Sequence, residues 1–174
     1  MKEIVRYGTT LGLICLLAGG LLAVVNSLAQ PRILAQAKEE EQRTLSEVLP
    51  QADRFEAVKA ADKEEAIYYK AYDKDNKLIG LAFKAEGKGY SSTVETMAGM
   101  NLDGEISTIK ILSQNETPGL GSRVTENSFT GQFKNKNIPD LSKVEAITGA
   151  TISSKAVIDL VKEKAEEIKA LIKN

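Results

Sequence analysis

A long uncharged stretch near the N-terminus constrains this chain more than any other feature of the sequence. No residue between Arg6 and Arg32 is charged, and the centre of the stretch, from Leu11 to Val25, is rich in Leu, Ile, Val, Ala and Gly. Roughly 25 uncharged residues suffice for a helix to cross a bilayer with some tilt. We therefore predict that residues 1–32 form a cytoplasmic N-terminus and one transmembrane helix in the lipid bilayer.

The flanking charges indicate an orientation for this helix. Lys2 and Arg6 precede it, whereas Arg32 and Lys38 are followed by three glutamates, Glu39–Glu41. The positive-inside rule favours a cytoplasmic N-terminus and an extracytoplasmic C-terminal domain. A cleavable signal peptide is the competing interpretation, because Ser27-Leu28-Ala29 resembles a cleavage site. We expect a retained anchor.

The composition excludes several classes of function. The chain has no histidine, which removes Ser-His-Asp and Cys-His catalysis and most transition-metal sites. Its one cysteine, Cys15, lies inside the apolar stretch, so the remainder has no thiol chemistry. A net charge of -1, 5% aromatic residues and no tryptophan argue against a nucleic-acid partner. We predict no metal site and no catalytic residue.

The rest of the chain has the pattern of an α+β domain. Residues 33–50 are predicted to form a membrane-proximal helix or stalk, because Ala37–Leu49 favours helix and Pro50 ends it. From Glu64 onward the pattern changes to strands, and residues 51–174 are predicted to hold an antiparallel sheet with flanking helices. The expected strands are Ile67–Tyr72, Leu78–Phe83, Tyr90–Met100 and Glu105–Leu112, with a hairpin turn at Asn101–Gly104, and the expected helices are Thr125–Phe133 and Lys155–Ile172.

The stretch from Thr148 to Ser154 joins an apolar run, Val144–Ile147, to the last predicted helix. The run is typical of a strand. Gly149 permits a sharp bend, and Ser153 and Ser154 suit N-cap or first-turn positions. The free amides at the start of a helix also favour a phosphate. The stretch alone therefore allows an anion site or an empty helix cap, and on local grounds the cap is the commoner case.

A second turn-rich loop runs from Glu116 to Gly121. Pro118 fixes one φ angle, and the two glycines free the backbone. Such a loop suits contact with a flat ligand or a plain connection. Three loop carboxylates, Glu116, Asp103 and Asp140, are candidates for acid–base work. Their spacing does not support that role, and we expect all three to be solvated.

Taken together, these motifs resemble a known family. Glu116-Thr117-Pro118-Gly119-Leu120-Gly121 followed by Thr148-Gly149-Ala150-Thr151 resembles the FMN-binding domain of the G subunit of the Rnf electron-transport complex. The C subunit of the Na⁺-pumping NADH:quinone oxidoreductase is a related protein. The resemblance covers most of the chain, including the membrane span and Gly89-Tyr90-Ser91 before a hairpin. This combination favours a ligand site over an empty cap.

The resemblance implies that FMN is attached covalently to Thr151 through a phosphoester bond made by a flavin transferase. Thr148 stands where the family often has Ser, and Glu145 where the modification motif usually has Asp. Gln114 and Asn115 stand where the family often has His. Tyr90 is a candidate to stack on the flavin, although core packing is the commoner role of such a tyrosine. The other expected cofactor-binding residues are Thr148, Gly149, Ala150, Ile152, Ser153, Glu116, Thr117, Gly119, Leu120 and Gly121.

The function implied by the resemblance is electron transfer within an ion-translocating ferredoxin:NAD⁺ oxidoreductase of the Rnf type. Such a complex lies in the bacterial or archaeal cytoplasmic membrane and supplies further membrane and peripheral proteins as partners. The flavin carries the chemistry, and no independent catalysis is expected of the protein. A membrane-anchored flavoprotein of another redox chain and a binding or structural domain without flavin remain alternatives.

Overall fold

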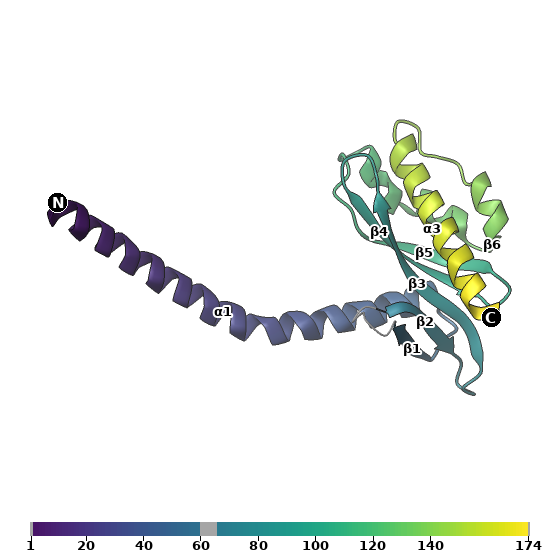
Figure 1. The fold of residues 1–174 in the computed structure, drawn as a ribbon. Coiled ribbons are helices and arrows are strands. Elements are labelled where there is room, and N and C mark those ends of the chain that lie inside the picture. The colour runs from purple at the N-terminus through teal and green to yellow at the C-terminus, as the bar shows by residue number, and fades with distance from the viewer. Residues whose placement is uncertain (1, 60–65, 174) are drawn as a thin grey trace. The chain divides into compact units, whose positions relative to one another are not determined.

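The structure is a computed structural model that describes residues 2–59 and 66–173 (Figure 1). It divides into two units, residues 1–41 and residues 42–174. Helix α1 (Lys2–Val48) provides the first unit and continues into the second. In the described part of the chain, it is the one helix long and apolar enough to cross a membrane. The predicted span and the predicted membrane-proximal helix are thus one continuous helix, with Pro31 inside it.

The second unit is an antiparallel sheet with helices, which confirms the predicted α+β class. The strands are β1 (Arg54–Lys59), β2 (Ala66–Tyr72), β3 (Leu78–Lys88), β4 (Thr93–Asn101), β5 (Glu105–Ser113) and β6 (Lys136–Asn137), and they are neighbours in chain order. Short helices follow β5, namely η1 (Gly121–Thr125), α2 (Asn127–Thr130), η2 (Gly131–Phe133) and η3 (Ile138–Lys143), and α3 (Thr151–Lys173) ends the chain. The predicted hairpin turn at Asn101–Gly104 joins β4 to β5, and Gly104 has a φ of 90°.

The larger core lies between α3 and one face of the sheet (Figure 1). Alternate residues of the strands, such as Phe83 and Ala98, face this core, and Val157, Val161 and Ile168 of α3 are buried in it. Phe129 and Phe133 belong to this core and make an edge-to-face contact, with their ring centroids 5.4 Å apart. Leu171 is 50% exposed, because it lies in the last turn of α3.

The C-terminal end of α1 packs against the opposite face of the sheet. Leu45, Val48 and Leu49 are buried there together with Ala71, Ala82 and Met97. Gly99 permits this close approach, because a Cβ atom at that position would lie 2.3 Å from the carbonyl oxygen of Val48. The last turns of α1 therefore belong to the folded domain, whereas the apolar residues of its first part are exposed.

Three local predictions are wrong, and each has a physical reason. Strand β1 was not expected, because its mostly exposed residues show no apolar alternation. Strand β4 begins at Thr93 and not at Tyr90, because the amides of residues 90–92 bond to a carboxylate and not to a neighbouring strand. Val144–Ile147 is not a strand, because side chains satisfy its backbone. Glu64, the predicted start of the strands, lies outside the described residues.

Candidate functional site

A cavity of about 410 Å³ lies where three segments of the second unit meet. Tyr90 comes from the connection between β3 and β4, the Glu116–Gly121 loop follows β5, and the third segment contains the start of α3. The lining residues are Tyr90, Glu116, Thr117, Leu120, Gly121, Gly149, Ala150, Thr151, Ile152 and Ser153. The fold thus brings the two loops identified in the sequence to one place, although 37 positions separate Glu116 from Ser153.

Two glycine turns adjoin the cavity. The amide of Leu120 donates to the carbonyl of Thr117, and Gly119 occupies the third position of this turn with a φ of 74°. The amide of Ala150 likewise donates to the carbonyl of Ile147, with Gly149 third at a φ of 82°. A positive φ at the third position is the requirement of a type II turn and selects glycine. The turns approach each other, because a Cβ atom at Gly149 would lie 3.3 Å from Leu120 Cδ2.

Glu116 connects all three segments through its carboxylate. Its side chain is 4% exposed. Oε1 accepts hydrogen bonds from the amides of Ser91 and Ser92, at 3.1 and 2.9 Å, and from Ser92 Oγ at 3.1 Å. Oε2 accepts from the Tyr90 amide at 3.2 Å and from Ser153 Oγ at 2.6 Å. The expectation that Glu116 is a solvated loop carboxylate is therefore wrong.

The surroundings of Glu116 determine its charge. Burial raises the pKa of a carboxyl group and is the largest single influence here. The hydrogen bonds from Ser153, Ser92 and Ser91 act in the opposite direction, and together they outweigh burial. They lower the pKa of Glu116 from its usual 4.5 to about 2. Glu116 is consequently an anion at neutral pH.

The other two candidate carboxylates do not meet Glu116. Asp103 is exposed in the hairpin turn between β4 and β5. Asp140 lies in η3 and forms an ion pair with Lys143 at 2.7 Å, which lowers the pKa of Asp140. The structure therefore shows no paired carboxylates for acid–base chemistry among these three residues. Glu116 acts as an acceptor that ties backbone segments together.

Small residues allow the segments to pack around this carboxylate. A Cβ atom at Gly89 would lie 2.6 Å from Glu116 Oε1. At Gly121 it would lie 2.7 Å from Ser153 Oγ and 2.8 Å from Glu116 Oε2. Either contact is too short for a side chain, so glycine at both positions is a condition of the hydrogen-bonded cluster.

The start of α3 forms the polar wall of the cavity. The helix begins at Thr151, four residues before the predicted start, so Ser153 and Ser154 lie in its first turn. Ser154 Oγ accepts from the amide of Ile147 at 3.0 Å and donates to the carbonyl of Ala150 at 2.9 Å. Thr151 and Ile152 are exposed. Amides of a first helical turn have no acceptor within their own helix, so this wall suits an anionic group.

The segment before the helix is held by a glutamine side chain. Gln132 Oε1 accepts from the amide of Glu145 at 2.9 Å, and Gln132 Nε2 donates to the carbonyl of Glu145 at 3.3 Å. Gln132 thus replaces the neighbouring strand that the sequence predicts for residues 144–147. The side chain of Glu145 itself is exposed.

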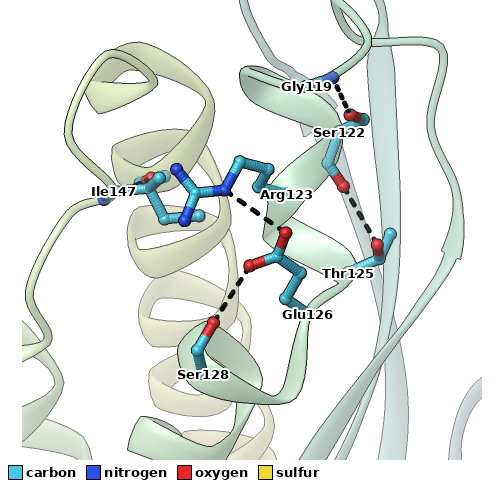
Figure 2. A network of polar contacts seen from close by, with 8 residues as sticks. Gly119, Ser122, Arg123, Thr125, Glu126, Ser128 and Ile147 are labelled. Carbon is cyan, nitrogen blue, oxygen red and sulfur yellow. Dashed lines mark hydrogen bonds and ion pairs between the residues drawn. The ribbon is translucent and has the colours of Figure 1, made fainter.

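A second network of hydrogen bonds begins in the Glu116–Gly121 loop and continues into the residues after it (Figure 2). The Gly119 amide donates to Ser122 Oγ at 3.0 Å, and Thr125 Oγ1 donates to the carbonyl of Ser122 at 3.0 Å. Arg123 Nε donates to Glu126 Oε1 at 3.2 Å. Figure 2 shows Arg123 paired with Glu126, which also accepts a hydrogen bond from Ser128. Glu116 is the one charged residue among those lining the cavity.

All ten lining residues belong to the set expected from the sequence, whereas Thr148 and Gly119 shape the turns without lining the cavity. Thr148 is exposed at the second position of its turn. Sequence reasoning missed Ser92 and Gln132. The signal for Ser92 is the polar run Tyr90-Ser91-Ser92 after Gly89, which supplies adjacent backbone donors. No local sequence pattern indicates the role of Gln132, because its hydrogen-bond partner Glu145 lies 13 residues away.

Comparison with known proteins identifies the family. A family described as the FMN-binding domain matches residues 89–166, which include the whole cavity lining. A family described as the RnfG N-terminal region matches residues 1–48. NqrC of Shewanella oneidensis, a solved structure, is 21% identical with a TM-score of 0.49 and covers 71% of this chain and 74% of its own. The assignment does not depend on that likeness.

Several relatives extend over nearly the full chain. The G subunit of the ion-translocating oxidoreductase complex of Methanosarcina acetivorans is 30% identical over 97% of this chain and 96% of its own length. The G subunit of the proton-translocating ferredoxin:NAD(+) oxidoreductase complex of Clostridium ljungdahlii is 34% identical over 88% of this chain and 85% of its own length. The G subunit of the Na(+)-translocating complex of Acetobacterium woodii is 31% identical over 90% of this chain and 87% of its own length. The chain therefore belongs to the RnfG family, the G subunits of the Rnf-type ion-translocating oxidoreductase complexes.

Proposed function

We propose that this protein is the electron-carrying G subunit of an Rnf-type complex and that it carries FMN bound covalently to Thr151. The observation that carries the proposal is the cavity between the two glycine turns, which lies within the region matching the FMN-binding domain family. Its volume of about 410 Å³ falls within the usual range of small-molecule sites. FMN, when bound, supplies the electron transfer, and the protein holds and orients it.

The geometry favours Thr151 over Thr148 as the attachment residue. Thr151 is exposed, lines the cavity and is the first residue of α3. A phosphate on its hydroxyl would lie at the positive end of a 23-residue helix. Thr148 lies outside the lining, on the turn that leads to the helix. A tether at Thr151 would keep the cofactor with an extracytoplasmic domain, where free flavin is scarce.

The remaining lining residues fit the flat ring of a flavin. Tyr90, Leu120 and Ile152 line the cavity and are 65%, 47% and 58% exposed. Large side chains with exposed apolar surface around one cavity are typical of a ligand site, because their contact with water is unfavourable and a ligand can remove it. An isoalloxazine ring between them would remove this apolar surface from solvent. Tyr90 lies outside the strand, so we propose a contact with the ring and not core packing.

The proposed setting is a membrane complex. Helix α1 would anchor the chain, and the flanking charges favour an extracytoplasmic position for the second unit. The other proteins of the complex would donate and accept the electrons, and a flavin transferase would attach the cofactor.

The test compares Thr151→Val with Thr148→Val in full chains co-expressed with a flavin transferase. The first change removes the proposed acceptor hydroxyl without loss of volume, so covalent flavin should be absent. The second removes the hydroxyl outside the cavity, so flavin should remain. Flavin fluorescence in denaturing gels and the intact mass report attachment.

Flavin retained in the Thr151 variant would refute the attachment site, and loss only in the Thr148 variant would move it there. An unmodified wild-type chain, colourless and of unchanged mass despite active transferase, would instead favour a binding or structural domain without flavin.

A further inference from the structure

The cavity has one formal charge, and it is negative. Among the ten lining residues, Glu116 alone has a charged side chain. Its carboxylate is 4% exposed and accepts from five donor groups within 3.2 Å. The nearest arginine in sequence, Arg123, is not part of the lining and is paired with Glu126. The lining therefore places an anion beside the proposed cofactor without a cation to balance it.

We propose that Glu116 is a positioning residue that also lowers the reduction potential of the bound flavin. The proposal rests on the function proposed above. Reduction adds electrons to the cofactor, and therefore negative charge. A fixed anion that is itself only 4% exposed opposes that charge, because the field of a buried charge is weakly screened by solvent and salt. The protein would thus make its cofactor a stronger reductant through a buried charged residue.

The hydrogen bonds to Glu116 allow the effect of charge to be separated from the effect of packing. Ser153 Oγ donates to Oε2 at 2.6 Å, the shortest of the five bonds. A donor at this distance offsets part of the carboxylate's charge. Removal of the donor therefore makes the field in the cavity more negative, provided that Glu116 stays ionised. Ionisation persists, because the amides of Ser91 and Ser92 and the Ser92 hydroxyl still donate to the carboxylate and still lower its pKa.

Two variants should consequently shift the potential in opposite directions. Glu116→Gln removes the negative charge, and the midpoint potential should rise. Ser153→Ala keeps the charge but removes its closest donor, and the potential should fall. A loosened or more solvated cavity would instead shift both variants in the same direction. Opposite signs are therefore a signature that a purely structural role does not produce.

Asp103→Asn provides a matched control, because Asp103 is exposed in the hairpin turn between β4 and β5 and does not meet Glu116. It removes the same charge from an exposed side chain outside the cavity lining, where solvent screens it. Its potential should remain at the wild-type value. The experiment measures the midpoint potential of covalent flavin spectroscopically in full chains, purified in detergent after co-expression with the transferase.

The outcomes separate this inference from the proposed function. A wild-type chain without flavin would refute the proposed function, and the inference would fall with it. With flavin present, a Glu116→Gln potential that is unchanged or lower would overturn the inference, as would shifts of the same sign in both variants. If Glu116→Gln does not fold, Ser153→Ala decides alone: a lower potential supports the inference, and an unchanged or higher one refutes it.

Discussion

Glu116 illustrates at the scale of one residue how a carboxylate is kept charged in a poorly solvated place. Burial disfavours the anion, but donors from two other segments favour it more strongly. Three of these donors are backbone amides of residues 90–92, which adjoin the start of β4. The same carboxylate thus accepts the backbone amides that a neighbouring strand would otherwise accept, and it places a negative charge in the cavity lining.

The lowered pKa of Glu116 predicts an acid-dependent contribution to stability. The ionised group stabilises the fold fully above its usual pKa of 4.5, and this stabilisation is lost as the pH falls toward about 2. The shift corresponds to roughly 3 kcal/mol. Glu116→Gln should therefore be less stable than wild type at pH 7, and the difference should shrink between about pH 4.5 and pH 2. Urea unfolding across this range measures it.

Asp140→Asn is the control for this titration. The pKa of Asp140 is also lowered, by its bond to Lys143, but that ion pair lies at the surface and is screened. Its stability should follow that of wild type at each pH without a measurable difference. A constant difference between Glu116→Gln and wild type from pH 7 to pH 2 would show that Glu116 is not anionic in the folded protein.

At the scale of an element, the segment before α3 shows that extended backbone can be held without a neighbouring strand. Gln132 makes two bonds to the main chain of Glu145, and Ser154 bonds to the amide of Ile147. These bonds fix the approach to the turn at Thr148 and Gly149. The position of Thr151 at the cavity therefore depends on side chains from two separate elements.

Replacement of Gln132 by alanine should release this segment. The amide of Glu145 loses its acceptor, so its hydrogen exchange should become about tenfold faster or more, and the domain should lose about 1–2 kcal/mol of stability. Ser128→Ala is the control, because it alters only an exposed side-chain bond to Glu126. Native-state hydrogen exchange with peptide resolution over residues 144–150 measures the effect. Unchanged protection of Glu145 would contradict the proposed clamp.

At the scale of the whole molecule, α1 serves two environments. Its first part exposes the apolar side chains expected of a membrane helix. Its last turns bury Leu45 and Val48 against the sheet and place Glu47 2.6 Å from Lys110 of β5. We therefore propose that the folded domain begins at about residue 42, whereas the sequence predicts residue 51, and truncation tests this boundary.

A chain of residues 42–174 should fold cooperatively, whereas residues 51–174 should be far less stable. The shorter chain lacks Leu45, Val48 and Leu49, and each buried side chain of this kind contributes roughly 1.5–3 kcal/mol. The expected difference is on the order of 5 kcal/mol, measured by urea unfolding. Glu47→Gln within residues 42–174 should cost less than about 1 kcal/mol, because its ion pair is partly exposed. Equal stability of the two chains would place the boundary after α1.

Sequence alone determined the features that depend on local pattern or on a distinctive motif. The apolar stretch predicted α1, the alternation of β2, β3 and β5 predicted an antiparallel sheet, and the two glycine loops with the Gly89-Tyr90-Ser91 motif indicated every residue that lines the cavity. Gly119 and Gly149 could be identified from the sequence because φ angles of 74° and 82° at the third position of a turn favour glycine. These inferences need no knowledge of what lies across the fold.

Tertiary structure decided the features that depend on distant partners. Glu116 differs from the solvated Asp103 only because folding places Ser92 and Ser153 around it. Val144–Ile147 is not a strand because Gln132 and Ser154 satisfy its backbone. The end of α1 is core because Gly99 leaves room for it. Each outcome follows from burial and hydrogen-bond partners far apart in the chain, and local sequence patterns carry no record of these.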